Sequence, residues 1–306
     1  MTHAPPAALR VAAPVAAALA ASRPVVALES TIISHGLPRP RNLAVAAELE
    51  EIVRGAGACP ATIAVLDGVA HIGCAPDELR RVAEDAELRK LGRRDLPVAL
   101  ALGASGATTV SATASLAALA GIRVFATGGL GGVHRDFAES RDESADLDAL
   151  SRTAITVVSA GVKSILDVPG TLQRLETLNV AVVGFRTRDF PAFYLARSGQ
   201  HLEWAVDSPG EVAAIMHQQD ALGFGAALVV ANPVAESEQL DPVVHDEVLA
   251  DALREADRRQ IAGPQITPFL LAEMVRATRG ASLEANLAAV RRNVRLGADI
   301  AIAYCL

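Results

Sequence analysis

Short apolar runs alternate with amphipathic stretches along nearly the whole chain. The apolar runs have the length of buried strands, and the longer stretches repeat with the period of an α-helix. This alternation predicts a three-layer α/β/α fold with a largely parallel central sheet. The predicted strands are 24–28, 62–66, 123–127, 155–159, 180–185 and 227–231. The predicted helices are 43–54, 76–88, 112–120, 171–178, 209–222, 242–259, 268–278 and 282–303.

One pair of apolar runs has a different connection. Asp67 and Gly68 alone separate the runs 62–66 and 69–72. An Asp-Gly pair between two such runs is a strong signal of a tight turn between antiparallel strands. We therefore expect one small antiparallel hairpin to decorate the sheet.

The length and composition favour one large domain. The 306 residues are 51% hydrophobic, and no long linker or internal repeat divides them, so we expect a single domain over 1–306. The alanine-rich segment 1–22 is expected to form an N-terminal helix. A secretory signal is the alternative, but Pro14 interrupts the segment and alanine makes a weak apolar region.

Charge and cysteine usage exclude some functions. A formal net charge of −7 argues against a nucleic-acid groove, although a small anionic substrate needs only a few local donors. No uninterrupted apolar run is long enough to span a bilayer. The three cysteines are sparse and lack metal-type spacing, which fits a reducing cytosol, so we expect a cytoplasmic protein.

Lysine is rare here, and one lysine follows a predicted strand directly. Lys163 comes after the apolar run 155–158, and ligand sites in α/β sheets lie at the carboxyl ends of strands. Desolvation lowers the pKa of an ammonium group, and a neutral amine can attack a carbonyl to form a Schiff base. The alternative is a surface residue at a helix start in an arginine-biased chain.

Glu29 closes the first predicted strand. A carboxyl group at the end of a buried strand is well placed for proton transfer, with its pKa raised by burial. A rim glutamate paired to an arginine is the alternative.

A glycine-rich stretch, 128–132, follows the strand 123–127 and leads to His134. Paired glycines let backbone N–H groups turn toward an anion and let a ligand approach closely. The spacing is not that of a dinucleotide-binding loop. His134 favours a site over the alternative, a flexible turn.

Asp142, Ser144 and Asp146 offer closely spaced oxygen atoms. Such groups suit Mg²⁺ or Mn²⁺. The alternative is helix capping by Ser144 or Asp146.

Lys90 could form a phosphate pocket with the hydroxyl and N–H groups of 108–111, where a helix begins. The alternative is a basic, solvated helix end. Asn286 lies inside the last predicted helix, where an asparagine is more often a surface residue than a ligand.

The motifs together resemble one family. The sequence Ala-Leu-Glu-Ser-Thr-Ile-Ile-Ser-His-Gly at 27–36 is similar to the opening motif of the pseudouridine-5′-phosphate glycosidases, the indigoidine synthase A-like family. The resemblance covers nearly the whole chain from Pro24 onward. The further segments that match in order are 93–97, 106–110, 125–129, 131–135, 144–147, 160–161, 163–167, 229–233 and 267–271.

The resemblance implies roles for individual residues. Lys163 matches the Schiff-base lysine, Glu29 the proton-transferring glutamate, and Asp142 the ligand of one Mn²⁺ per chain. The positions that match substrate contacts or further active-site positions are Lys90, Val110 through its backbone, Ser144, Ala145, Asp146, His134 and Asn286.

The resemblance also implies a reaction and an assembly. The expected activity is reversible cleavage of pseudouridine 5′-phosphate to uracil and ribose 5-phosphate by a homotrimer. A carbon–carbon bond joins the ribose to the base, so its cleavage needs an electron sink, which a lysine imine on the ring-opened sugar supplies. Two alternatives stay open: an aldolase-type Schiff-base lyase on another sugar phosphate, and a non-catalytic sugar-phosphate-binding module.

Overall fold

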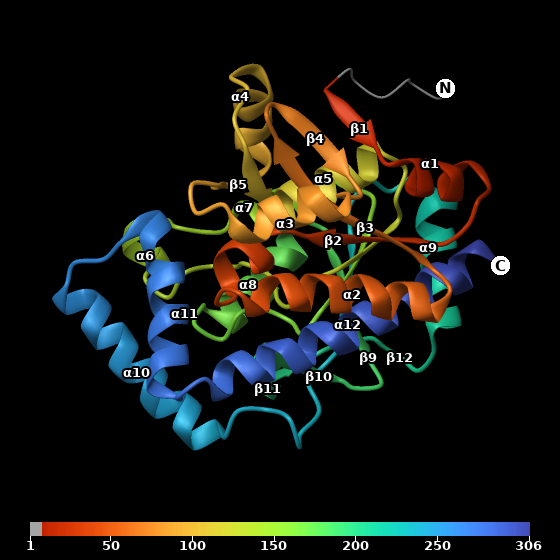
Figure 1. Cartoon of the computed structure of the whole chain (residues 1–306). Helices are drawn as coiled ribbons and strands as arrows, with labels where there is room; N and C mark the ends of the chain where they lie inside the picture. The colour runs from red at the N-terminus through yellow and green to blue at the C-terminus, as the bar shows by residue number, and fades with distance from the viewer. Residues whose placement is uncertain (1–7) are drawn as a thin grey trace.

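An 11-stranded sheet lies between two layers of helices in the computed structural model, which describes residues 8–306 (Figure 1). The predicted three-layer fold with a mostly parallel sheet is confirmed. In order across the sheet, the strands are β1 (Leu9–Val11), β4 (Val69–Ile72), β3 (Cys59–Leu66), β2 (Val25–Glu29), β7 (Val124–Ala126), β8 (Thr156–Ser159), β13 (Leu228–Ala231), β9 (Ala181–Phe185) and β12 (Ala205–Val206).

The central strands are buried on both faces, which explains their continuous apolar sequences. In β2, Val25 and Ala27 pack into one layer, while Val26 and Leu28 pack into the other. The second of these layers contains α2 (Arg41–Ala56), α9 (Pro209–Leu222) and α12 (Ala281–Cys305), and α2 and α12 run side by side across the front of Figure 1. The opposite layer contains α1 (Ala13–Ala20), α5 (Val110–Leu119), α7 (Ala145–Ser151) and α8 (Val168–Thr177).

The remaining helices lie around these layers. Helices α10 (Pro242–Arg258) and α11 (Ile266–Ala277) form a pair at the left of Figure 1. The short helices are α3 (Pro76–Glu84), α4 (Leu96–Ala101) and α6 (Phe137–Ser140), with 3₁₀ turns at Arg93–Asp95 and Gly263–Gln265 and a π-helical turn at Ile32–Gly36.

The predicted hairpin is confirmed. Strands β3 and β4 pair antiparallel, and Asp67 and Gly68 have φ values of 49° and 75°. Positive φ at both central residues is the geometry that the Asp-Gly pair favours.

Two short strands adjoin the central sheet, and their direction matters for function. Strand β6 (Gly106–Thr108) pairs antiparallel with β3 and parallel with β5 (Arg89–Leu91). Because β6 runs opposite to β2, the carboxyl ends of the two strands meet, and the Thr108 N–H donates to Ser30 Oγ at 2.8 Å.

The structure corrects three expectations. The segment 1–22 is not one helix: within the described residues, β1 pairs parallel with β4 before α1 begins at Ala13, because the sheet edge offers hydrogen bonds. The helix predicted for 76–88 ends at Glu84, since Asp85 is extended and β5 pairs with β6. A second antiparallel ribbon, β10 (Asp189–Ala192) and β11 (Leu195–His201), was not predicted.

Candidate active site

The carboxyl ends of β2 and β7 form a topological switch point. The chain passes from β2 to β3 on one side and later places β7 on the other side of β2. Loops that leave such neighbouring strands diverge, and ligands of open α/β sheets bind in the resulting crevice. Glu29 ends β2 here, and the Thr127 hydroxyl, one residue beyond β7, donates to Glu29 Oε1.

Burial raises the pKa of Glu29 above its ordinary value of 4.5. The positive charge of Lys163, the hydrogen bond from Thr127 and the charge of Lys90 partly oppose this shift, while the charge of Asp146 adds to it. The charges of Lys163, Lys90 and Asp146 therefore all act on Glu29. A carboxyl group that is held toward its protonated form is suited to donate a proton.

Lys163 lies on a tightly packed turn after β8. Its Nζ donates to the carbonyl oxygen of Gly129 at 2.8 Å, and its side chain is partly buried. Gly161 has φ +75°, and an added Cβ would lie 2.1 Å from the Pro191 carbonyl oxygen, so only glycine fits there. Leu130 and Val162 form a parallel bridge. The turn after β8 and the glycine stretch 128–132 thus support each other.

Asp146 joins the glycine stretch to the start of α5. Its Oδ1 accepts from Ser111 N–H and its Oδ2 accepts from Gly131 N–H, each at 2.9 Å. The side chain is 6% exposed. These two hydrogen bonds hold the start of α5 and the glycine stretch in position. Any contact of Asp146 with a ligand would add to them.

The helix-capping alternative holds for Ser144 and not for Asp146. Ser144 precedes α7, and its hydroxyl accepts from Asp146 N–H at 3.2 Å. Ser144 Oγ also faces the glycine stretch, since a Cβ added at Gly131 would lie 2.2 Å from it. Ala145 is exposed.

Lys90 and the start of α5 form the cationic side of the site. Lys90 is opposite Ala107 in the β5–β6 register. Ala107 lies two residues before Thr109, which directly precedes α5. Val110 has a buried side chain, and its N–H lies in the first helical turn, where no intrahelical acceptor exists. Lys90 is exposed, and the surrounding protein and the charge of Lys163 lower its pKa. This geometry suits an anionic ligand.

Asn286 faces the site from α12 and not the solvent. Its Oδ1 is buried without a hydrogen-bond partner, and a Cβ added at Gly128 would lie 2.9 Å from it. Sequence reasoning missed Asn293, whose Nδ2 donates to the Thr127 carbonyl oxygen at 2.7 Å and whose Oδ1 accepts from Asn232 at 3.0 Å. The seven-residue spacing of the two asparagines, which places both on one helix face, is the signal that could have indicated it.

Asp142 and His134 are the groups available for a divalent metal. Asp142 Oδ2 lies 3.9 Å from His134 Nε2, and His134 N–H donates to the Asp142 carbonyl oxygen at 3.1 Å. Among residues 8–306, no three His, Cys, Asp or Glu side chains gather into a metal-binding group. One carboxylate fits Mn²⁺ or Mg²⁺, which keep several water ligands, and does not fit a zinc site built from protein ligands.

Buried polar atoms without partners concentrate on this side of the sheet. Six such side-chain atoms occur among the described residues. Five of them follow β2, β5 or β8 or face the glycine stretch, and the sixth, Arg123 Nε, lies at the amino end of β7. The five are Thr31 Oγ1, Ser34 Oγ, Arg93 Nη1, Ser159 Oγ and Asn286 Oδ1. Unpaired buried groups are costly in a folded protein, and a bound ligand or water would supply the missing partners here.

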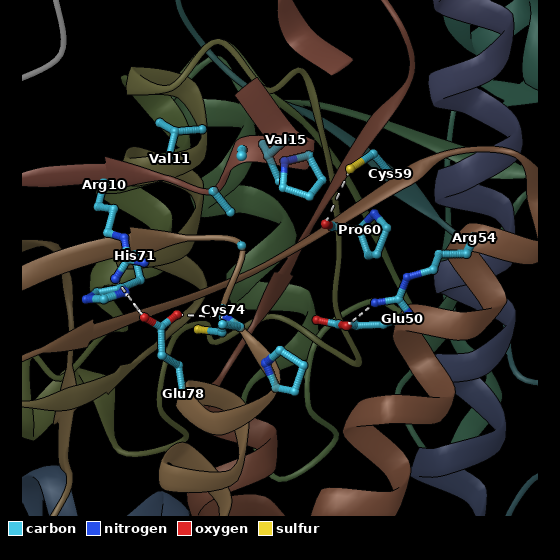
Figure 2. Close-up of a pocket in the computed structure, with 16 residues that line it drawn as sticks. Arg10, Val11, Val15, Glu50, Arg54, Cys59, Pro60, His71, Cys74 and Glu78 are labelled. Carbon is cyan, nitrogen blue, oxygen red and sulfur yellow. Dashed lines mark hydrogen bonds and ion pairs between the residues drawn. The ribbon is translucent and has the colours of Figure 1, made fainter. Parts of the chain in front are cut away.

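A cavity of about 620 Å³ lies at the β1–β4 edge of the sheet, between β1, α1, α2, the start of β3 and the start of α3. Figure 2 shows its charged side chains directed at one another. Glu50 accepts from Arg54 at 2.5 Å and from the Thr62 hydroxyl at 2.7 Å. His71 Nδ1 lies 3.0 Å from Glu78 Oε1. These groups satisfy each other, and no predicted site residue lines this cavity.

Comparisons with known proteins agree with the sequence motifs. Residues 14–303 match the family model of indigoidine synthase A-like proteins. The chain is 67% identical to a pseudouridine-5′-phosphate glycosidase of Streptomyces griseus, over 95% of this chain and 90% of that protein. It is 59% identical to one of Frankia alni, over 96% and 81%.

Two solved structures have the same fold. The prealnumycin C-glycosynthase AlnA in complex with ribulose 5-phosphate has a TM-score of 0.91 at 34% identity, covering 98% of both chains. An indigoidine synthase A-like protein from Thermotoga maritima has a TM-score of 0.90 at 34% identity, covering 100% of both chains.

Proposed function

The chain belongs to the indigoidine synthase A-like family, and we propose that it reversibly cleaves pseudouridine 5′-phosphate to uracil and ribose 5-phosphate. It is an enzyme of the pseudouridine-5′-phosphate glycosidase class. The observation that supports the proposal for this site is that Glu29 ends β2 and Lys163 follows β8 at the same edge of the parallel strands, where the charge of Lys163 acts on the Glu29 carboxyl group. A related protein solved with ribulose 5-phosphate supports a sugar-phosphate ligand.

The proposed chemistry begins at C1′ of the ribose. The Lys163 nitrogen replaces the ring oxygen at C1′, the ring opens, and the oxygen takes a proton. The nitrogen lone pair then forms an imine while the C1′–C5 bond breaks. The electrons of the broken bond pass to the uracil ring, where C5 takes a proton. Water adds to the imine, which frees ribose 5-phosphate and restores the amine.

Glu29 is the proposed proton carrier for these steps. Its raised pKa favours the protonated form, from which it can supply the ring oxygen or C5 of the base. The Thr127 hydroxyl fixes the carboxyl group in place. After Glu29 has given up its proton, its carboxylate can accept a proton from the Lys163 ammonium. The same residue can therefore both donate and accept protons during the reaction.

The phosphate is proposed to bind at the start of α5. Lys90 and Val110 N–H offer a cation and a free donor there, and Ser144 Oγ lies across the glycine stretch. Such remote binding energy positions the sugar for the reaction at C1′.

Asp142, with His134 beside it, is proposed to hold one Mn²⁺, which would stabilise charge that develops on substrate oxygens. Asp142→Ala should lower activity about tenfold or more and leave the melting temperature nearly unchanged, because this partly exposed loop carboxylate contributes little to the core. The measurement is activity during Mn²⁺ titration after chelation. A variant that titrates like the parent would remove Asp142 from metal binding.

Uracil release from pseudouridine 5′-phosphate, followed by its absorbance with and without Mn²⁺, tests the reaction. An aldolase-type lyase would cleave another sugar phosphate and release no uracil. A binding module would bind ribose 5-phosphate without any turnover and without an adduct after borohydride reduction. The homotrimer and the cytoplasmic location remain predictions; none of the helices in 8–306 is long and apolar enough to cross a membrane.

A further inference from the structure

A buried histidine contacts the residue that follows Lys163. His245 Nε2 lies 2.7 Å from Ser164 Oγ, and both side chains are 3% exposed. His245 Nδ1 lies 2.9 Å from Asp246 Oδ1, whose side chain is 81% exposed. His245 belongs to the first turns of α10, 81 positions away in sequence from Ser164.

The hydrogen-bond directions follow from the donor inventory. An ionised Asp246 can only accept, so the Nδ1–H of His245 donates to it, and in the neutral imidazole Nε2 then accepts from the Ser164 hydroxyl. A serine, a histidine and an aspartate follow one another here as in a serine hydrolase. The Ser164 hydroxyl, however, is enclosed by protein and, among the described residues, hydrogen-bonds only with His245, so it is not placed to attack a substrate. Its contact therefore secures the backbone of this turn.

The turn is held from a second side as well. Arg135 donates from Nη2 to the Ser164 carbonyl oxygen at 2.9 Å and from Nε to the Ile165 carbonyl oxygen at 3.2 Å. Ser164 is thus bound through its side chain by α10 and through its backbone by the loop after the glycine stretch. These contacts restrict the residue whose backbone directly continues from Lys163.

We propose that His245 is a positioning residue that, through Ser164, holds the Lys163 amine at the distance needed for attack on C1′. The inference rests on the proposed function. The proposed phosphate contacts come from other elements, so loss of the Ser164–His245 bond should slow imine formation and leave substrate binding intact. A misplacement of about 1 Å in a reacting group can lower a rate about 100-fold.

The experiment uses the full-length variants Ser164→Ala, His245→Leu and the double variant, with Mn²⁺ present. We expect kcat to fall about 10- to 100-fold in each single variant, with KM within about threefold of the parent. The double variant should lose no more than the worse single variant, because both remove one interaction. The trapping rate with ribose 5-phosphate and borohydride should fall in parallel.

Two further variants separate positioning from stability. His245→Gln keeps an acceptor for Ser164 and should recover most of kcat. His71→Leu removes a buried histidine from the β1–β4 edge of the sheet, outside the proposed site, and should lower the melting temperature with kcat unchanged. Ser164→Ala removes a single atom, so it decides the question if His245→Leu does not fold.

Three results would overturn the inference: an unchanged kcat in Ser164→Ala, a raised KM with kcat preserved, or additive losses in the double variant. A parent protein that forms no adduct and releases no uracil would instead refute the proposed function itself.

Discussion

At the β1–β4 edge of the sheet, Glu50 and Glu78 each have partners within the protein, whereas polar atoms at the carboxyl ends of β2 and β8 are buried without partners. Both regions contain ionisable side chains in a partly enclosed space. The first is the more obvious hollow, with a cavity of about 620 Å³. The second lies at the switch point of the sheet.

This difference separates a structural network from a site. A polar network whose members satisfy each other stabilises the fold and leaves little for a ligand. Groups that are buried but unpaired lower stability and are retained where a ligand completes them. The balance of partners, and not the size of the hollow, therefore favours the carboxyl ends of β2 and β8 as the region of the proposed site.

Lys163→Ala should produce the largest effect and should abolish turnover while substrate binding stays measurable. The Lys163 nitrogen supplies the lone pair that forms the imine as the carbon–carbon bond breaks, and Lys163→Arg should not restore turnover, since guanidinium stays protonated. Mass spectrometry should place one reduced sugar phosphate on the parent peptide that contains Lys163. An adduct on Lys90 would exchange the roles of the two lysines.

Glu29→Gln should lower kcat about 100- to 10,000-fold and should stabilise the fold. Burial holds the folded-state pKa of Glu29 above its ordinary value of 4.5, so the native protein binds more protons than the unfolded chain between the two pKa values. Stability therefore falls as pH rises through that window. Denaturant unfolding at several pH values should show the advantage of the variant increasing with pH from about 4.5 upward. An advantage that is independent of pH would contradict this account.

Lys90→Met should lower kcat/KM for the nucleotide about 10- to 100-fold, because a charge-assisted phosphate contact contributes about 1.5–3 kcal/mol. The parent should strongly prefer pseudouridine 5′-phosphate to pseudouridine, and the variant should lose part of that preference. Steady-state kinetics with both substrates measure it. Equal kcat/KM values of the parent for both compounds would exclude a phosphate pocket here.

Glu50→Ala should have the smallest effect on activity, within about twofold, but should lower the free energy of unfolding by about 1–3 kcal/mol. The change leaves the buried Thr62 hydroxyl, which lies outside the proposed site, without its acceptor. Glu50→Gln, which keeps an acceptor, should lose less. Activity loss in Glu50→Ala without loss of stability would mean that this cavity also has a functional role.

The sequence by itself determined the elements whose signals are local. Hydrophobic period placed the six central parallel strands and most helices within a few residues, and the Asp67-Gly68 pair placed the hairpin, whereas β1, β5 and β12 were not predicted. Strand ends pointed to Glu29 and Lys163, because side chains at the carboxyl ends of parallel strands share one edge.

Only the tertiary structure decided how those elements share their hydrogen bonds. The pairing of β1 with β4, the two N–H groups on Asp146, the inward-facing Asn286 and the Ser164–His245 contact all join distant parts of the chain. A local pattern carries no record of such partners, since a buried polar group is stabilised by whichever segment the fold brings beside it. For the same reason, residue types alone could not show which ionisable clusters are paired and which await a ligand.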